Sequence, residues 1–467
     1  MLGRGSASRA LPLLGFAALA AGFLFELARH LPTGGDFWTF WAAARALGAG
    51  LNPYRAASLT RVAALPPGPA PGPFLSPLFL AEWMRPLGAL PFATARLLWL
   101  VLNLASSALL LLVLLQQGGF RRTVWSVLAG AALLMAFQPY DITLWIGQTD
   151  VLVAAALAVA WVCLERDRPL LAGLAAAVAA IDVHLLMGFG FYLLYRAVAR
   201  RDVRPLAGLA AGLALEAALC LLHPGDTAYW LLVTLPHAQA AAIEPWDTLS
   251  ALQAASELVG ARADWAVAVA VGLGMVGLSL AAWRRPGATP QRDLAVATVL
   301  TLATTTFAYN QDYLLLVLAF PFLAQCWRQG VAPAWTGALA LCLAAGFGLA
   351  QLTGGLVAPS HAGFVIGAPV LALGILGTLP GFRARLAPAH RRWAGAWVAL
   401  TLGGYAGFTL SRWEVGPELL LLAGLLTFML LVGVGNAGGT WPAGGGAARA
   451  VSPHREESPG PMAGVPA

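Results

Sequence analysis

The sequence predicts an all-α polytopic membrane protein, built as a bundle of about 12–14 transmembrane helices. Three observations predict this class. Only 10% of the 467 residues are charged, whereas a soluble domain carries about a quarter. The mean hydropathy is +0.74. Apolar runs of roughly the length that crosses a bilayer recur along the whole chain. A surface of this composition cannot lie mostly in water.

The arginines predict the orientation in the membrane. They cluster in short connections between apolar runs, as the positive-inside rule expects of cytoplasmic loops. These connections are 4–9, 118–122, 165–168, 196–204, 284–292, 327–330 and 382–392. The net charge of +7 therefore follows from topology, and we expect no nucleic-acid partner. The absence of lysine beside abundant Ala, Gly, Pro and Arg indicates a high-G+C bacterial genome.

Each apolar run is expected to be one membrane segment. The first, 11–30, has a basic start and predicts an uncleaved span with a cytoplasmic N-terminus, with a signal peptide as the alternative. The other runs are 92–115, 123–138, 150–164, 169–183, 185–198, 205–223, 263–283, 294–309, 311–327, 334–353, 362–380, 393–410 and 416–436. Several are short enough to be broken or tilted. Alternation puts every basic cluster inside, provided that residues 31–91 stay outside.

The predicted organisation is one transmembrane domain, 1–437, followed by a Gly/Pro/Ser-rich tail, 438–467, expected to be disordered in the cytoplasm. Two long loops, 31–91 and 224–262, are expected on the extracytoplasmic side. Within the first, residues 76–90 are apolar but short and bounded by prolines, which predicts a juxtamembrane or re-entrant helix. The four cysteines show no paired spacing, so neither a disulfide framework nor a cysteine-ligated metal site is expected; the outer acids could bind a divalent ion, but their spacing shows no dedicated motif and none is assigned.

The unusual polar residues gather on the predicted outer side. Ionisable groups at membrane depth are costly, so they usually face a cavity and mark a functional path. The group comprises Asp36, Asp141, Gln148, Asp150, Asp182, His184, His223, Asp226, His237, Gln239, Glu244, Asp247, Asn310, Gln311, Asp312 and Tyr313. We expect the segment 139–150 to be a tight loop and 181–184 to be the turn of a hairpin.

A purely structural role is a simple interpretation of each residue taken alone. Asp36 precedes a helical segment and is a favourable N-cap. Trp38 and Trp41 suit an interfacial belt of aromatic residues. Asp182 and His184 could satisfy two helix ends. The clustering of these residues favours a functional role, because the acidic residues lie on one predicted side of the membrane and the arginines lie on the other.

Five segments in order carry a resemblance to a known family. They are "GGDFWTFWAAARALGAGLNPY" (34–54), "SPLFLAEWMRPLGALPFATARLLWLVLNLA" (76–105), "GQTD" (147–150), "RPLLAGLAAAVAA" (168–180) and "AYNQDYLLLVLAFP" (308–321). Together they resemble the bacterial polyprenyl-phosphate-sugar-dependent glycosyltransferases of family 87, mannosyltransferase-like members of the GT-C superfamily. The resemblance implies a GT-C fold in the bacterial inner membrane, with a long first extracytoplasmic loop that carries the catalytic acid at its start.

The resemblance also implies roles for residues. The catalytic acid falls on Asp36, which would act as general base on an acceptor hydroxyl. The donor would be a hexose, mannose-like, on a polyprenyl phosphate, and the acceptor an extracytoplasmic lipid or glycan. Because the lipid phosphate leaves as a stable anion, one base with cationic groups near the phosphate suffices, and no cofactor is expected. Candidate substrate-binding residues are Gln148, Asp150, Asp182, His184, His237, Asp312 and Tyr313, with Arg45, Arg85 and Arg96 for the phosphate.

One segment departs from the family's pattern. Where relatives commonly carry a basic residue followed by proline, this chain has "IDVHLL", with Asp182 and His184. Two other classes stay open: a transporter or flippase, and a non-catalytic partner in envelope-glycan assembly. The long first outer loop favours the transferase, and the sequence shows no inverted repeat of the transporter kind.

Overall fold

A computed structural model describes residues 35–63, 72–135, 137–240, 264–284, 289–305 and 309–329, together with a few residues between 17 and 28. The described residues are helical, without strands. In chain order the elements are α2 (Gly35–Gly48), α3 (Ala56–Val62), α4 (Leu78–Trp83), α5 (Arg85–Gly88), α6 (Phe92–Gln117), α7 (Val124–Met135), α8 (Gln138–Ile146), α9 (Asp150–Glu165), α10 (Pro169–Ala177), η1 (Val178–Asp182), α11 (Val183–Ala199), α12 (Arg204–Leu221), α13 (Pro224–Tyr229), η2 (Trp230–Thr234), α14 (Leu235–Ala240), α16 (Asp264–Arg284), α17 (Pro290–Thr304), η4 (Asn310–Ala319) and α18 (Phe320–Gln329).

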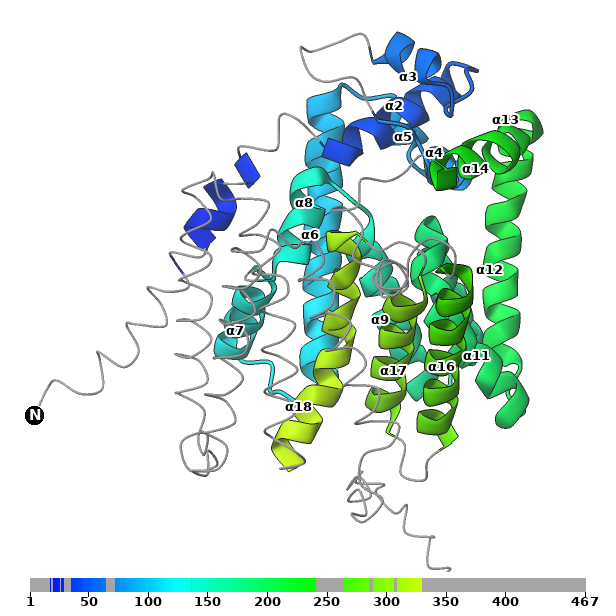
Figure 1. The fold of residues 1–467 in the computed structure, drawn as a ribbon. Helices are drawn as coiled ribbons and strands as arrows, with labels where there is room; N and C mark the ends of the chain where they lie inside the picture. The colour runs from blue at the N-terminus through cyan, green and yellow to red at the C-terminus, as the bar shows by residue number, and fades with distance from the viewer. Residues whose placement is uncertain are drawn as a thin grey trace, which may run out of the picture.

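The long helices lie side by side, and the short ones gather at one end of them (Figure 1). Helices α6, α9, α11, α12, α16 and α17 form the upright part of the bundle in that view. Helices α2 to α5, with α13 and α14, lie across its upper end. This cap comes from the predicted first and second outer loops, so the end of the bundle that carries the acidic residues is a folded helical layer.

Three helical stretches of the described residues are long and apolar enough to cross a membrane: Phe92–Gln117, Pro169–Ala199 and Arg204–Leu221. Helices α7 and α8, bent by 76° at their junction, would together make a fourth. The structure thus confirms an all-α membrane protein. The predicted spans beyond residue 330, the tail 438–467 and most of the span 11–30 lie outside the described residues.

The stretch Pro169–Ala199 turns back on itself at Asp182. The backbone of Asp182 leaves the helical region, with φ −122° and ψ 83°. Arg204, which follows the stretch, pairs with Asp167, which precedes it, at 3.6 Å. A straight helix of that length would hold its ends about 46 Å apart, so the chain ascends through α10 and η1 and descends through α11. The tight hairpin predicted at 181–184 is present.

Two expectations are wrong in detail. The segment 139–150 is not a tight loop, because residues 138–146 form α8 and place Asp141 inside a helix. The aromatic residues of α2 do not form an interfacial belt. Trp38 and Trp41 are 7% and 6% exposed, and α2 packs against α4, α5 and α6 with ten of its fourteen residues buried. Burial of these large side chains against the cap helices fixes α2 to the bundle.

Glycines let neighbouring helices approach closely. A Cβ on Gly208 of α12 would lie 2.1 Å from the carbonyl oxygen of Leu170 on α10, and one on Gly188 of α11 would lie 2.0 Å from that of Ala297 on α17. In a bilayer, where lipid tails are as apolar as leucine, such close backbone packing is a main source of helix association. These contacts hold the hairpin between α12 and α17.

Candidate active site at the capped end of the bundle

The site begins where α2 meets α8. Gly35 starts α2 with φ +46°, and a Cβ there would lie 2.5 Å from the Cα of Ile146, the last residue of α8. Only glycine combines this left-handed backbone with so close an approach. The contact sets the start of α2, and with it Asp36, directly over the end of α8.

Asp36 is held by the residue that follows the α8 cap. The Gln148 Nε2 donates a hydrogen bond of 2.6 Å to the Asp36 Oδ2. Gly147 ends α8 with φ +76°, and its carbonyl accepts from the Trp99 indole at 2.7 Å. Arg96 closes the same helix end by donating to the carbonyls of Leu144 and Trp145 at 2.9 and 2.8 Å. These contacts fix the end of α8 and, with it, the position of Gln148.

The tip of the α10–α11 hairpin meets this loop. The Thr149 hydroxyl donates to the Asp182 carboxylate, which joins the loop after α8 to the hairpin turn. Two residues after Asp182, the His184 Nε2 lies 3.1 Å from the Asp312 Oδ2. The Asp150 carboxyl group interacts with those of Asp312 and Asp182. We call the group Asp36, Gln148, Thr149, Asp150, Asp182, His184 and Asp312 the carboxylate cluster.

The carboxylate cluster has an excess of hydrogen-bond acceptors. The buried Asp150 Oδ2 has no hydrogen-bond donor among the described residues. Four carboxyl groups and one imidazole, that of His184, lie within the cluster, so it holds more acidic than basic groups. Acceptors buried in this way are stabilised by donors that a ligand brings. The arrangement suits a ligand with several hydroxyl groups.

Burial raises the pKa of the Asp36 carboxyl above its ordinary value, and the hydrogen bond from Gln148 offsets part of this shift. A raised pKa makes the carboxylate a stronger base. The carboxylate acts as a base only while it is ionised, so the shift must stay limited for it to work at neutral pH. Asp36 is half-buried and so is not sealed from solvent. The residue can therefore take a proton from a nearby hydroxyl.

The structure does not bring three predicted binding residues to the carboxylate cluster. Arg45 donates to the Gly88 carbonyl at 3.3 Å and lies over the Trp41 ring. Arg85 pairs with Glu82 at 3.2 Å and is exposed. The exposed His237 contacts the carbonyl of Val233 in the preceding element, η2. Their side chains are engaged in the cap.

Two further predicted residues adjoin the site as parts of its frame. Arg96 lies beside the loop, and its Nη2 donates to the α8 carbonyls, so this nitrogen supports the end of the helix. Tyr313 is fully buried next to Asp312. Asp312 also accepts from the Tyr309 N–H at 2.8 Å, which caps η4. Thr149 was missed, because a threonine beside two named residues carries no signal in sequence.

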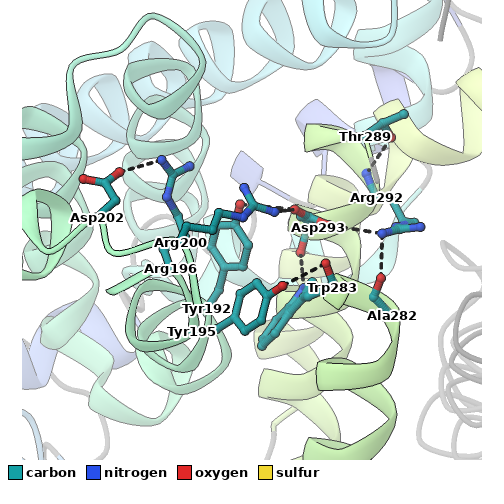
Figure 2. Close-up of polar contacts among 10 residues, drawn as sticks. All are labelled: Tyr192, Tyr195, Arg196, Arg200, Asp202, Ala282, Trp283, Thr289, Arg292 and Asp293. Atoms are coloured by element: carbon teal, nitrogen blue, oxygen red, sulfur yellow. Dashed lines mark hydrogen bonds and ion pairs between the residues drawn. The ribbon is translucent and has the colours of Figure 1, made fainter. Parts of the chain in front are cut away.

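A second polar network lies at the arginine-bearing end and ties α11 to α16 and α17 (Figure 2). The Asp293 carboxylate accepts from Arg200 at 3.0 Å and from the Tyr192 hydroxyl at 3.2 Å. Tyr195 donates to the Trp283 carbonyl at 3.0 Å. Here the Asp293 carboxylate is paired with two arginines, Arg200 and Arg292, whereas the four carboxyl groups of the carboxylate cluster share one basic residue. This network fastens helices together.

The described residues are helical, and several helices are apolar and long enough to cross a bilayer. An acidic cluster lies under a helical cap. These features define an integral membrane protein with a polar site at one end of its bundle. A model of glycosyltransferase family 87 matches residues 74–308. The chain belongs to glycosyltransferase family 87. The match begins just before α4 and extends past α17, so α2, with Asp36, and α3 lie outside it. No curated protein and no solved structure matches the chain.

Proposed function

We propose that this glycosyltransferase moves a hexose, mannose-like, from a polyprenyl-phosphate donor to an extracytoplasmic lipid or glycan, with Asp36 as the general base. The hydrogen bond from Gln148 to Asp36, at the edge of the carboxylate cluster, is the observation that carries the proposal. In the proposed orientation the protein lies in a bacterial inner membrane. The N-terminus and the arginine-rich connections are cytoplasmic, and the cap is extracytoplasmic.

The proposed step balances with one base. The Asp36 carboxylate takes the proton of the acceptor hydroxyl while that oxygen attacks the anomeric carbon of the donor sugar. The bond from that carbon to the phosphate oxygen breaks, and its electron pair leaves with the lipid phosphate. Because the phosphate is already a stable anion, no protonated carboxyl group has to assist its departure.

The carboxylate cluster would hold the sugar. Its acceptor oxygens match the hydroxyl donors of a hexose. We assign a sugar hydroxyl to the Asp150 Oδ2, which has no hydrogen-bond partner among the described residues. His184 is the basic group that we assign to the donor phosphate, with Asp312 orienting its ring at 3.1 Å. Gln148 fixes the base, because its amide fills one side of the Asp36 carboxylate.

The test compares purified wild type, Asp36→Asn and Asp167→Asn with a set of radiolabelled polyprenyl-phosphate sugars and membrane acceptors. Asp167→Asn is the matched control, since it makes the same chemical change at an 86% exposed side chain paired only with Arg204. We expect Asp36→Asn to lose transfer by at least about a hundredfold, as loss of a general base does. Equal transfer by all three proteins, or none by wild type with any donor, would refute the proposal.

A further inference from the structure

An apolar groove runs along the bundle at the end opposite the proposed active site. Helix α6 contributes Leu109, Leu112 and Val113, and helix α9 contributes Val159 and Val162. The groove has a volume of about 330 Å³. From Leu109 to Gln116 it follows two turns of α6, which is roughly 10 Å along the axis. One wall, α6, is a helix long and apolar enough to cross a membrane.

Three arginines stand where this groove ends. Arg122, Arg166 and Arg168 line it together with Gln116 and are all exposed. Within the part of the chain that the structure describes, none of the three pairs with a carboxylate at ion-pair distance, and Arg122 donates to the Gln116 side chain. The neighbouring Glu165 accepts hydrogen bonds from Gln291 at 3.1 Å and from Gln117, and it attracts Arg166 electrostatically beyond ion-pair distance.

We infer that this groove binds an anionic phospholipid, with the phosphate on the three arginines and one acyl chain along α6 and α9. Charge selects the headgroup, because guanidinium groups bind phosphate oxygens in a bidentate geometry. The apolar walls select a chain, which a free phosphate does not have. Basic pockets between transmembrane helices at this depth suit anionic lipids of the leaflet they face. The inference is independent of the sugar-transfer reaction.

The experiment measures lipid retention by the detergent-solubilised full chain, using native mass spectrometry. Phosphatidylglycerol and phosphatidylcholine with identical acyl chains are offered together in equal amounts. We expect wild type to retain phosphatidylglycerol at least about tenfold more tightly, since each surface arginine contributes severalfold to binding of an anionic lipid. The charge variant replaces Arg122, Arg166 and Arg168 with glutamine and is expected to lose this preference.

Two matched variants separate the parts of the inference. The charge control replaces Arg121, Arg201 and Arg284 with glutamine; these are also exposed but do not line the groove. It is expected to keep the preference. Val162→Trp fills the groove while it keeps every arginine, and it is expected to weaken phosphatidylglycerol retention at least about fivefold.

Four outcomes would overturn the inference. They are a charge variant that binds like wild type, a charge control that loses the preference equally, a Val162→Trp variant that binds normally, and displacement of the lipid by inorganic phosphate. If the triple charge variant does not fold, the single change Arg168→Gln gives the same comparison with a smaller expected loss. Sugar transfer is not read out, so failure here leaves the proposed function untouched.

Discussion

Gly35→Ala is the change that tests most directly how α2 is set over α8. The glycine has φ +46°, and a Cβ would lie 2.5 Å from the Ile146 Cα and 2.9 Å from the Ile146 carbonyl oxygen. Contacts of this kind ordinarily begin near 3.4 Å, so α2 and α8 must separate by about 1 Å. The atoms in the way are backbone, which cannot rotate aside.

The cost of this change has two parts. Alanine in the left-handed region costs about 1–2 kcal/mol, and forcing the two helix ends apart costs about 1–3 kcal/mol more. Gly50→Ala should carry only the backbone cost, since Gly50 has φ +71° and no atom lies within 4 Å of the added Cβ. The difference between the two variants isolates the helix contact.

The assay is thermal unfolding of the detergent-solubilised protein, followed by sugar transfer on the folded fraction. Gly35→Ala should unfold at a lower temperature than Gly50→Ala. On the proposed function, a 1 Å displacement of Asp36 should reduce transfer by about a hundredfold, while Gly50→Ala transfers normally. If the two variants unfold together and transfer equally, the close approach of α2 and α8 does not position the base.

Three further predictions follow from the same site and its frame. Gln148→Leu removes the hydrogen bond that lowers the pKa of Asp36; because the base acts only when ionised, the acidic limb of the pH–rate profile should move to higher pH, and an unmoved limb contradicts this role. Arg96→Gln leaves the Leu144 carbonyl without its donor and should lower stability by about 2–4 kcal/mol, measured by unfolding; an unchanged midpoint would argue against the cap. Gly208→Ala places a Cβ 2.1 Å from the α10 backbone and should cost about 1–3 kcal/mol of stability, unless α12 shifts freely and unfolding is unaltered.

Much of the fold follows from hydropathy and arginine placement alone. The span 92–115 became α6, and the break at 181–184 became the hairpin turn at Asp182. Helices α4 and α5 formed where a short, non-spanning apolar segment was predicted. These features depend on local composition, because length and charge decide whether a segment can cross a bilayer.

The features that sequence reasoning missed depend on tertiary contact. A run such as "PYDITLWIG" (139–147) reads as a polar turn, and α8 forms there because Arg96 from another helix satisfies its last carbonyls. Trp38 and Trp41 read equally well as belt residues or core, and only the cap helices decide between them. Asp36, Asp150, Asp182 and Asp312 were expected only to lie on the same side, and the structure places them in one cluster, whereas Arg45 and Arg85 lie elsewhere in the cap.

The ascending arm of the hairpin has a consequence for depth. Helix α10 has nine residues and η1 has five, which gives a rise of about 24 Å from the arginine-bearing end to Asp182. The hydrocarbon layer of a typical bilayer is about 30 Å thick. With its arginine-bearing end placed at one edge of that layer, the arm would be about 6 Å shorter than the layer is thick, and a water-soluble reactant would have to descend to the tip. Bilayer thickness then becomes a variable of access, since a thicker membrane lengthens that descent and a thinner one shortens it.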